Sequence, residues 1–327
     1  MIRFAEYLSS EPDEFSIHLR QLGVRDVVIE MPTGQPNGEP PWSEKSLQRA
    51  VDAYAERGLR VEAIEEDNSP PLHRTRLGAD GRDEEIDVYC SLIENMGKVG
   101  IPVLCYNWMA VIGVQRTSLA VKGRGGALVT AFERDHESML EPTEAGHIPS
   151  EQLWDSLEYF LDRVVPVAEQ SGVRLAMHPD DPPLPSIRGI DRIMSNLENF
   201  QRLIDINDSS SNSIAFCQGN FTLMTDDVPK AIRHFGNQDR IAFGHFRDVD
   251  GDVENFVETF HDEGKSDMLA CMQAWEDIPF AGVLRPDHVP TLAGESNDQP
   301  MYARLARLFA LGYMVGLRES TTNTSSD

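Results

Sequence analysis

The stretch VRLAMHPDDPPLPS, residues 173–186, begins as a buried strand and then stops abruptly. Val173, Leu175 and Met177 recur at every second position, which is the period of a β-strand. His178 follows, and the aspartates and prolines after it cannot continue a regular element. His178 therefore marks the end of a strand, where it either helps to hold the turn or directs a ligand atom into a cavity.

Eight short apolar runs of this kind recur along the chain, each bounded by Gly, Pro or Asp, as buried strands are. They are Ile2–Leu8, Asp26–Met31, Arg60–Ile64, Ile101–Tyr106, Val173–His178, Ser213–Cys217, Arg240–His245 and Phe280–Leu284. Segments with helical spacing separate them, among them Ser43–Arg57, Gln152–Gln170 and Tyr302–Leu317. This alternation predicts parallel βαβ units, and eight of them fit a (β/α)8 TIM barrel of the α/β class. A doubly wound open sheet is the alternative, but it usually carries a glycine-rich phosphate loop, and we find no convincing one.

The remaining residues divide into long loops and a tail. We expect one TIM-barrel catalytic domain over residues 1–318 and a disordered tail over residues 319–327. The polar segments Glu65–Glu84 and Asn107–Ser150 follow the third and fourth strands. We therefore expect both to be extended βα loops on the C-terminal face of the barrel, acting as lids or oligomer contacts.

The composition narrows the range of partners. The formal net charge is −25, and only five of the 29 basic residues are lysine. Phosphate contacts need a basic face, so the charge argues against nucleic acid and is typical of a salt-adapted surface. The apolar runs are too short to cross a membrane, and the first residues lack the apolar centre of a signal peptide. Four scattered cysteines favour a reducing compartment, so we expect a cytoplasmic protein. We also expect it to form a homo-oligomer.

Potential metal ligands stand at the ends of the last four predicted strands. The fifth strand ends in His178, the sixth in Cys217 and the seventh in His245, and Asp287 follows the eighth. In a TIM barrel these positions share one rim, where the chemistry of such proteins takes place. Imidazole, thiolate and carboxylate together predict a divalent transition metal, and the thiolate argues against Mg²⁺ and Ca²⁺.

At these residues the sequence resembles the mannonate dehydratase family of sugar-acid lyases. The similar stretches, in the family's order, are CYNWM (105–109), AMHPDDPP (176–183), FCQG (216–219), GHFRDV (244–249), ETFHDEGKSDM (258–268), RPDH (285–288) and RLFALGYMVGL (307–317). The resemblance implies a TIM barrel that removes water from D-mannonate to give 2-keto-3-deoxy-D-gluconate. It also implies a divalent metal, usually Mn²⁺, with Fe²⁺ or another transition metal as the alternative.

The resemblance also implies roles for individual residues. The metal ligands would be His178, Cys217, His245 and Asp287. Arg285, His288 and Tyr302 would lie near the reacting carbons and, with Asp287, form the catalytic set; which residue is the base stays open. We expect Arg285, Asn107, Asp180 and Arg247 to contact the sugar acid. Two alternatives stay open: Asp180 and Asp181 are equally suited to holding the turn through Asx hydrogen bonds, and Arg247 to forming a local ion pair with Asp248 that holds the seventh-strand loop.

Two other readings remain. A metal-dependent sugar isomerase or epimerase is one, because metal barrels of this shape also support enediol chemistry; its product would retain the water. A barrel that binds or regulates without turnover is the other, and the complete ligand set argues against it. Gln218, Val289 and the segment LPSIRGI (184–190) depart from the family pattern, so another aldonate is a further alternative to D-mannonate.

Overall fold

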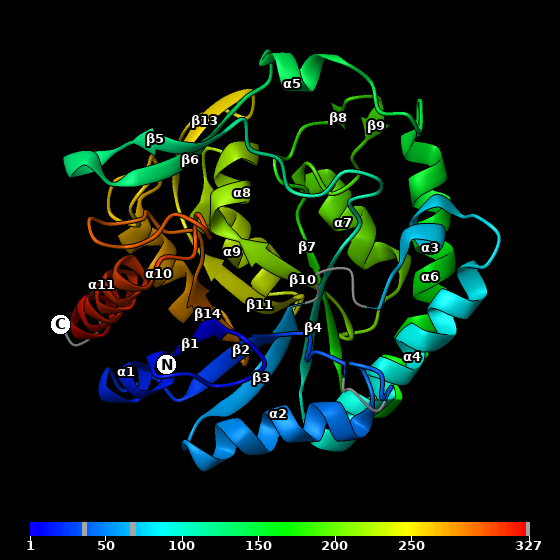
Figure 1. The fold of residues 1–327 in the computed structure, drawn as a ribbon, viewed down its shortest axis with the longest axis horizontal. Coiled ribbons are helices and arrows are strands. Elements are labelled where there is room, and N and C mark those ends of the chain that lie inside the picture. Colours follow the sequence, from blue (N-terminus) through cyan, green and yellow to red (C-terminus); the bar gives the residue numbers. More distant parts are fainter. Residues whose placement is uncertain (35–37, 66–69, 325–327) are drawn as a thin grey trace.

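A closed barrel of eight parallel strands forms the centre of the chain (Figure 1). The structure is a computed structural model that describes residues 1–34, 38–65 and 70–324. The barrel strands are β1 (Arg3–Leu8), β2 (Asp26–Glu30), β3 (Arg60–Glu65), β4 (Val103–Asn107), β7 (Arg174–His178), β10 (Asn212–Cys217), β11 (Ile241–Phe246) and β14 (Val283–Pro286). Strand β14 closes the barrel on β1, with Val283 opposite Arg3. The predicted TIM barrel is confirmed, and each of the eight apolar runs contributes one of its strands.

Helices cover the outside of the barrel (Figure 1). The longer ones are α1 (Phe15–Gln21), α2 (Glu44–Glu56), α4 (Arg82–Val99), α6 (Ser150–Ser171), α7 (Leu197–Ile206), α9 (Val228–Gly236), α10 (Met268–Asp277) and α11 (Arg304–Thr324). Helix α2 begins where its sequence predicts, because the Ser43 side chain accepts a hydrogen bond from the Ser46 N–H, 3.2 Å away. Among the described residues, no helix is long and apolar enough to span a bilayer.

The two long segments after β3 and β4 contain regular structure that the sequence analysis assigned to loops. The first contains α3 (His73–Leu77) and the start of α4. The second contains β5 (Ser118–Lys122), β6 (Leu128–Glu133) and α5 (Glu137–Leu140). Strand β6 pairs with β13 (Asn255–Glu258), which pairs with β12 (Val249–Gly251) in the loop after β11. We call this antiparallel sheet, β12-β13-β6-β5, the rim sheet.

The end of the chain differs from the prediction. Helix α11 continues to Thr324, so the boundary predicted at residue 318 stands too early and residues 319–324 are helical rather than a disordered tail. Residues 325–327 lie outside the described part. The helix is also less buried than its apolar sequence suggests, because Leu305 and Phe309 are 49% and 41% exposed. Its other face, with Ala306, Ala310 and Met314, is buried against the barrel.

Mostly small side chains of the barrel strands, together with the larger Phe243, form a cluster of their own. Its members are Ala5, Val28, Ala63, Val103, Cys105, Ala176, Ala215, Ala242, Phe243 and Val283. The larger apolar residues of the same strands pack outward against the helices, in the main core. Because successive side chains of a strand face opposite sides, the small residues occupy the barrel interior. Further along, at the carboxyl ends of the strands, polar residues replace them.

Candidate metal centre and active site

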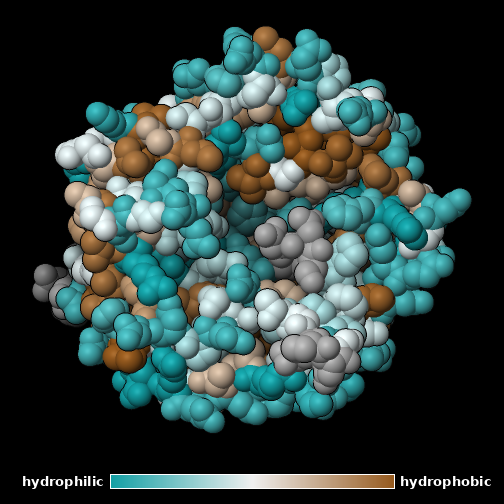
Figure 2. All heavy atoms as spheres, in the orientation of Figure 1, coloured by the Kyte–Doolittle hydropathy of each residue, from teal (hydrophilic) through white to brown (hydrophobic). Residues whose placement is uncertain are grey.

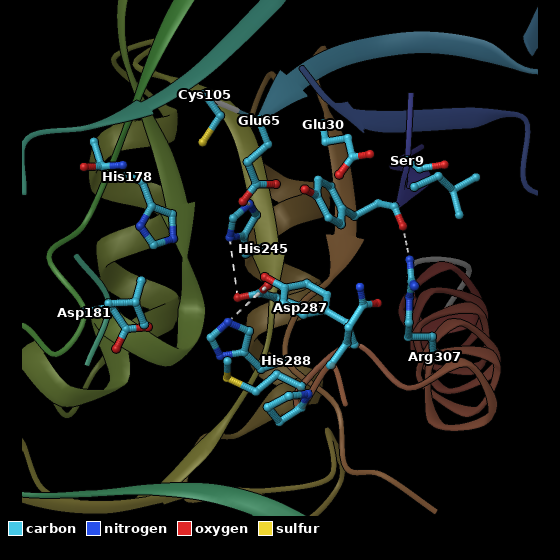
Figure 3. Close-up of a pocket in the computed structure, with 18 of the residues that line it drawn as sticks. Ser9, Glu30, Glu65, Cys105, His178, Asp181, His245, Asp287, His288 and Arg307 are labelled. Atoms are coloured by element: carbon cyan, nitrogen blue, oxygen red, sulfur yellow. Dashed lines mark hydrogen bonds and ion pairs between the residues drawn. The ribbon is translucent and has the colours of Figure 1, made fainter. Parts of the chain in front are cut away.

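A cavity of about 660 Å³ opens at the carboxyl ends of the barrel strands. Figure 2 shows the hollow near the middle of this face, and Figure 3 shows the polar side chains inside it. Sequence-predicted residues that line it are Asn107, His178, His245, Asp287, His288 and Tyr302. Further lining residues include Tyr7, Glu30, Glu65, Cys105, Asp181, Arg304 and Arg307. The cavity thus lies at the rim where TIM barrels place their chemistry.

Three of the predicted metal ligands meet at one point of this rim. Ligand atoms of His178, Cys217 and His245 all lie within 4.8 Å of one another. Asp287 adjoins them, with its Oδ2 3.8 Å from the Cys217 Sγ and 3.6 Å from the His245 Nδ1. His178 Nδ1 lies 2.8 Å from the Pro179 carbonyl oxygen. A carbonyl only accepts, so Nδ1 carries the hydrogen and Nε2 keeps its lone pair for a metal.

His245 provides the test of whether a cation fits. The side chain is 1% exposed, and neither ring nitrogen has a hydrogen-bond partner in the described part of the chain. Burial and Arg285 lower its pKa, but Glu65 and Asp287 outweigh them and raise the pKa to about 9. A buried imidazole without a hydrogen bond, with one carboxylate 3.6 Å from each ring nitrogen, is suited to a cation, which displaces the ring proton on binding. The N₂SO donor set therefore fits a divalent transition metal.

A second group around His245 was missed by the sequence analysis. Ligand atoms of Glu65 and Cys105 also lie within 4.8 Å of each other and of His245. Burial raises the pKa of Glu65, but Arg285 and His245 lower it to about 2, so this carboxylate is ionised. Glu65 is the last residue of β3, whereas Cys105 lies within β4, whose last residue is Asn107. From the sequence alone Cys105 is interpreted as structural, because no partner for it is evident, and Glu65 falls in the polar segment interpreted as a loop.

Arg285 supports these carboxylates from behind the cavity. Its guanidinium donates to both Glu65 oxygens, at 2.8 and 2.9 Å from Nη2, and to Asp287 Oδ1 at 2.9 Å. The residue is 1% exposed and does not line the cavity. Bidentate donation of this kind orients a carboxylate. The structure thus places Arg285 as a holder of Glu65 and Asp287, and its contact with substrate stays a prediction.

Arg247 likewise lies behind the cavity, in a buried ion-pair network. The network comprises Arg247, Asp181, Glu258 and Arg116. Arg247 Nη2 donates to Glu258 Oε1 at 2.9 Å, and Nη1 donates to Asp181 Oδ2 at 3.1 Å. Arg116 reaches both acids as well, at 2.7 Å from Asp181 Oδ1 and 2.5 Å from Glu258 Oε1. Two buried cations thus face two buried anions, which is the arrangement that makes buried charge tolerable.

The two remaining predicted substrate contacts differ in placement. Asp180 is 1% exposed, does not line the cavity, and accepts hydrogen bonds from the Met194 N–H at 2.7 Å and Arg192 at 3.2 Å. These bonds join the segment after β7 to residues 192–194, 12 and 14 positions further along, and so differ from the local Asx bonds of its alternative reading. Asn107 does line the cavity, and its Oδ1 accepts a hydrogen bond from the Met109 N–H at 3.1 Å. Contact of either residue with substrate stays a prediction.

His288 and Tyr302 stand together at the cavity wall, as predicted for catalytic residues. Their rings lie 5.8 Å apart, nearly edge to face. His288 Nδ1 is 3.0 Å from Glu258 Oε1, and its Nε2 is 3.9 Å from Asp287 Oδ1. Burial and the nearby Asp287 raise the pKa of Tyr302 well above its usual range. At neutral pH the phenol therefore keeps its proton.

These features define a class: a TIM-barrel protein with a transition-metal site and acid–base side chains at the C-terminal rim. Comparison with known proteins defines the family. The family model for D-mannonate dehydratase (UxuA) matches residues 3–147 and 143–327. The chain therefore belongs to the mannonate dehydratase family.

Individual relatives agree with this assignment. The mannonate dehydratase of Thermotoga petrophila is 33% identical over 91% of this chain and 90% of its own. Mannonate dehydratase 2 of Halalkalibacterium halodurans is 32% identical over 86% of this chain and 88% of its own. The crystal structure of mannonate dehydratase from Streptococcus suis has a TM-score of 0.91 at 28% identity, covering 100% of this chain and 95% of that one. An L-ribulose 3-epimerase, with a TM-score of 0.64 at 15% identity, shares the fold.

Proposed function

We propose that this protein is a metal-dependent D-mannonate dehydratase that forms 2-keto-3-deoxy-D-gluconate. The observation that carries the proposal is the cluster of His178, Cys217 and His245 in a chain from this family. Both histidines line one cavity with His288 and Tyr302, whereas Cys217 is buried and does not itself line it. The cavity also has room for a six-carbon acid. An epimerase is the weaker candidate, because the likeness to epimerases extends to the fold alone.

The reaction removes the proton from C2 and the hydroxyl from C3 of the sugar acid. His178, Cys217, His245 and Asp287 would hold the metal, for which we propose Mn²⁺, with Fe²⁺ as the alternative. A divalent cation there supplies Lewis-acid stabilisation of the negative charge that develops on the carboxylate. Arg285 keeps Glu65 and Asp287 ionised and oriented, because its guanidinium donates to both.

The proton transfers fall to the two side chains at the wall. Tyr302 retains its proton at neutral pH, so it is our candidate for the acid that protonates the leaving hydroxyl. His288 is our candidate for the base that takes the C2 proton on Nε2, because its Nδ1 is engaged by Glu258. Asp287 completes the catalytic set as a metal ligand that Arg285 orients and that lies beside His245.

Turnover of purified protein tests the function. Protein with Mn²⁺ and D-mannonate should form a 2-keto acid, and chelation of the metal should abolish this product. D-Gluconate and other aldonates form the comparison panel. Absence of 2-keto acid with every aldonate would overturn the proposal, and an isomerised sugar without loss of water would favour the epimerase.

We also propose a cytoplasmic homo-oligomer. No disulfide joins the four cysteines, all of which lie in the described part of the chain, and this supports a reducing compartment. Light scattering of the purified protein measures the oligomeric state. A monomer at micromolar concentration would contradict that part of the proposal.

A further inference from the structure

We propose that Glu258 of the rim sheet is a positioning residue that holds His288 by accepting a hydrogen bond from its Nδ1–H, so that Nε2 faces the substrate. The inference rests on the proposed function, and it adds a residue that neither the ligand set nor the acid–base pair contains. Its basis is the contact of 3.0 Å between Glu258 Oε1 and His288 Nδ1 in a buried setting.

The direction of this hydrogen bond follows from the charge of Glu258. Burial raises the pKa of this carboxyl, but Arg247 and Arg116 outweigh it and lower the pKa to about 2. An ionised carboxylate only accepts hydrogen bonds, so the hydrogen must lie on Nδ1 of His288. Whatever the state of Nε2, the proton that faces Glu258 stays in place. A buried carboxylate orients the proton-transferring histidine of catalytic triads in the same way.

Glu258 itself is fixed from two sides. Arg247 binds it with a pair of parallel hydrogen bonds, 3.0 Å from Nε to Oε2 and 2.9 Å from Nη2 to Oε1. Arg116 adds a contact to Oε1 from the segment before β5. Both guanidinium groups also contact Asp181, so neither can swing away without leaving a buried carboxylate unpaired. The imidazole is thereby aligned by rigid elements rather than by a mobile side chain.

The position of Glu258 in the fold explains why it has this role. It is the last residue of β13, and the preceding Val257 pairs with Ala131 of β6. His288 follows β14 of the barrel. The hydrogen bond therefore joins the rim sheet to the barrel, and it places the imidazole relative to both Asp287 and Tyr302. A shift of about 1 Å in such an arrangement is enough to cost two orders of magnitude in rate.

Kinetics of Glu258→Gln provide the first test. This change keeps the shape and removes the charge, so kcat for D-mannonate should fall by roughly 10²–10⁴-fold while KM and metal content stay near those of the wild type. The matched control is Glu254→Gln, because Glu254 lies in the turn just before β13, is 58% exposed and pairs with the exposed Arg134. The control should keep wild-type kcat. Loss of metal or a rise in KM without loss of kcat would overturn the proposal.

The double variant Glu258→Gln/His288→Gln separates positioning from an independent role. If Glu258 acts through His288, the double variant should be no slower than His288→Gln alone. If the fall in kcat of the double variant equals the product of the falls in the two single variants, the proposal is overturned. Turnover by the wild type shows whether the proposed function holds. If the wild type is active and kcat of Glu258→Gln equals that of the wild type, only the positioning role is refuted.

A spectroscopic readout does not depend on turnover. In metal-free protein labelled with ¹⁵N-histidine, the His288 signal is identified by its absence in His288→Gln. Its Nδ1 should carry a hydrogen whose resonance lies far downfield, and Glu258→Gln should move it upfield because the charge assistance is lost. An unprotonated Nδ1, or a resonance unchanged in Glu258→Gln, would overturn the proposal even if the protein dehydrates none of the aldonates.

Discussion

Cys217 illustrates how one residue at the end of a strand acquires a chemical role. Its thiol lies in the cluster with His178 and His245, 3.8 Å from Asp287 Oδ2 and 3.5 Å from Arg247 Nη1. The side chain is fully buried. A buried thiol among apolar neighbours is inert, but one beside a cation and two imidazoles is placed to bind a metal as thiolate.

Replacing Cys217 by Ser should therefore lower the metal content. A hydroxyl binds a soft divalent metal far more weakly than a thiolate does, so we expect a loss of at least tenfold in metal affinity. Metal per chain after dialysis, measured by elemental analysis, checks this. Cys90→Ser is the control, because Cys90 lies in α4 away from the cavity. Unchanged metal in Cys217→Ser would remove this residue from the ligand set.

Tyr302→Phe tests the proposed acid. The variant keeps the ring that packs near His288 and Tyr7 but loses the hydroxyl. We expect kcat to fall by about 10²-fold or more, with metal content unchanged, because only the proton donor is lost. Steady-state kinetics with D-mannonate measure the change. Tyr159→Phe, on α6 outside the cavity, should behave as wild type, and equal rates in both variants would exclude Tyr302 as the acid.

At the scale of elements, the strand ends of the site were the most predictable part. His178, Cys217 and His245 terminate runs whose apolar pattern and bounding residues identify them as strands, and closure of the barrel brings those ends together. Glu65 ends β3 in the same way, but it also begins the polar segment that the sequence predicts as a loop. Cys105 lies within β4, and from the sequence it is interpreted as structural because no partner for it is evident.

The partners from the rim sheet could not be predicted in this way. Arg116 and Glu258 are 142 residues apart in sequence, and each lies in a segment that looks like a polar loop. Only the pairing of β6 with β13 brings them together. For the same reason Arg247 and Arg285 are predicted from the sequence to contact substrate, with a local ion pair to Asp248 as the alternative for Arg247. The sequence does not reveal that distant buried carboxylates surround both guanidinium groups.

Close packing between α10 and β11 supplies a prediction at this scale. A Cβ on Gly244 would lie 2.6 Å from the Leu284 Cδ1 and 2.8 Å from the Trp275 Cη2. Gly244→Ala should therefore lower the free energy of unfolding by about 1–3 kcal/mol through overpacking. Denaturant titration measures it. Gly312→Ala is the opposite case, because Gly312 lies in α11 with open space around it. This change should raise the free energy of unfolding by about 0.5–1 kcal/mol. Equal effects of the two changes would contradict this account.

For the whole molecule, the dominant feature is its charge of −25. Many surface acids pair with arginine, as in Arg233–Asp277 and Arg202–Glu158, but most of the excess has no counterpart. Self-repulsion of this size destabilises a compact state, and salt screens it. The acidic surface is thus a property of the whole chain and separate from the site chemistry.

Thermal unfolding in potassium chloride tests the consequence. We expect the melting temperature to rise between 0.1 and 2 M salt, by roughly 2–4 °C for each kcal/mol of repulsion that is screened. Sucrose at matched osmolality is the control, because it contains no ions to screen charge. A melting temperature that stays constant or falls in salt would count against salt adaptation.

The rim sheet has one further consequence, for the order in which the molecule forms. Contacts that close a loop as long as that between Arg116 and Glu258 form late in folding, after the local βα units. Glu258 and His288 both belong to the last quarter of the chain, so a nascent chain acquires its ligand residues His178, Cys217 and His245 before the parts that align its acid–base pair. Asp287, the fourth proposed ligand, directly precedes His288, so both the metal site and the acid–base pair are complete only once the final strand and helix have been synthesised.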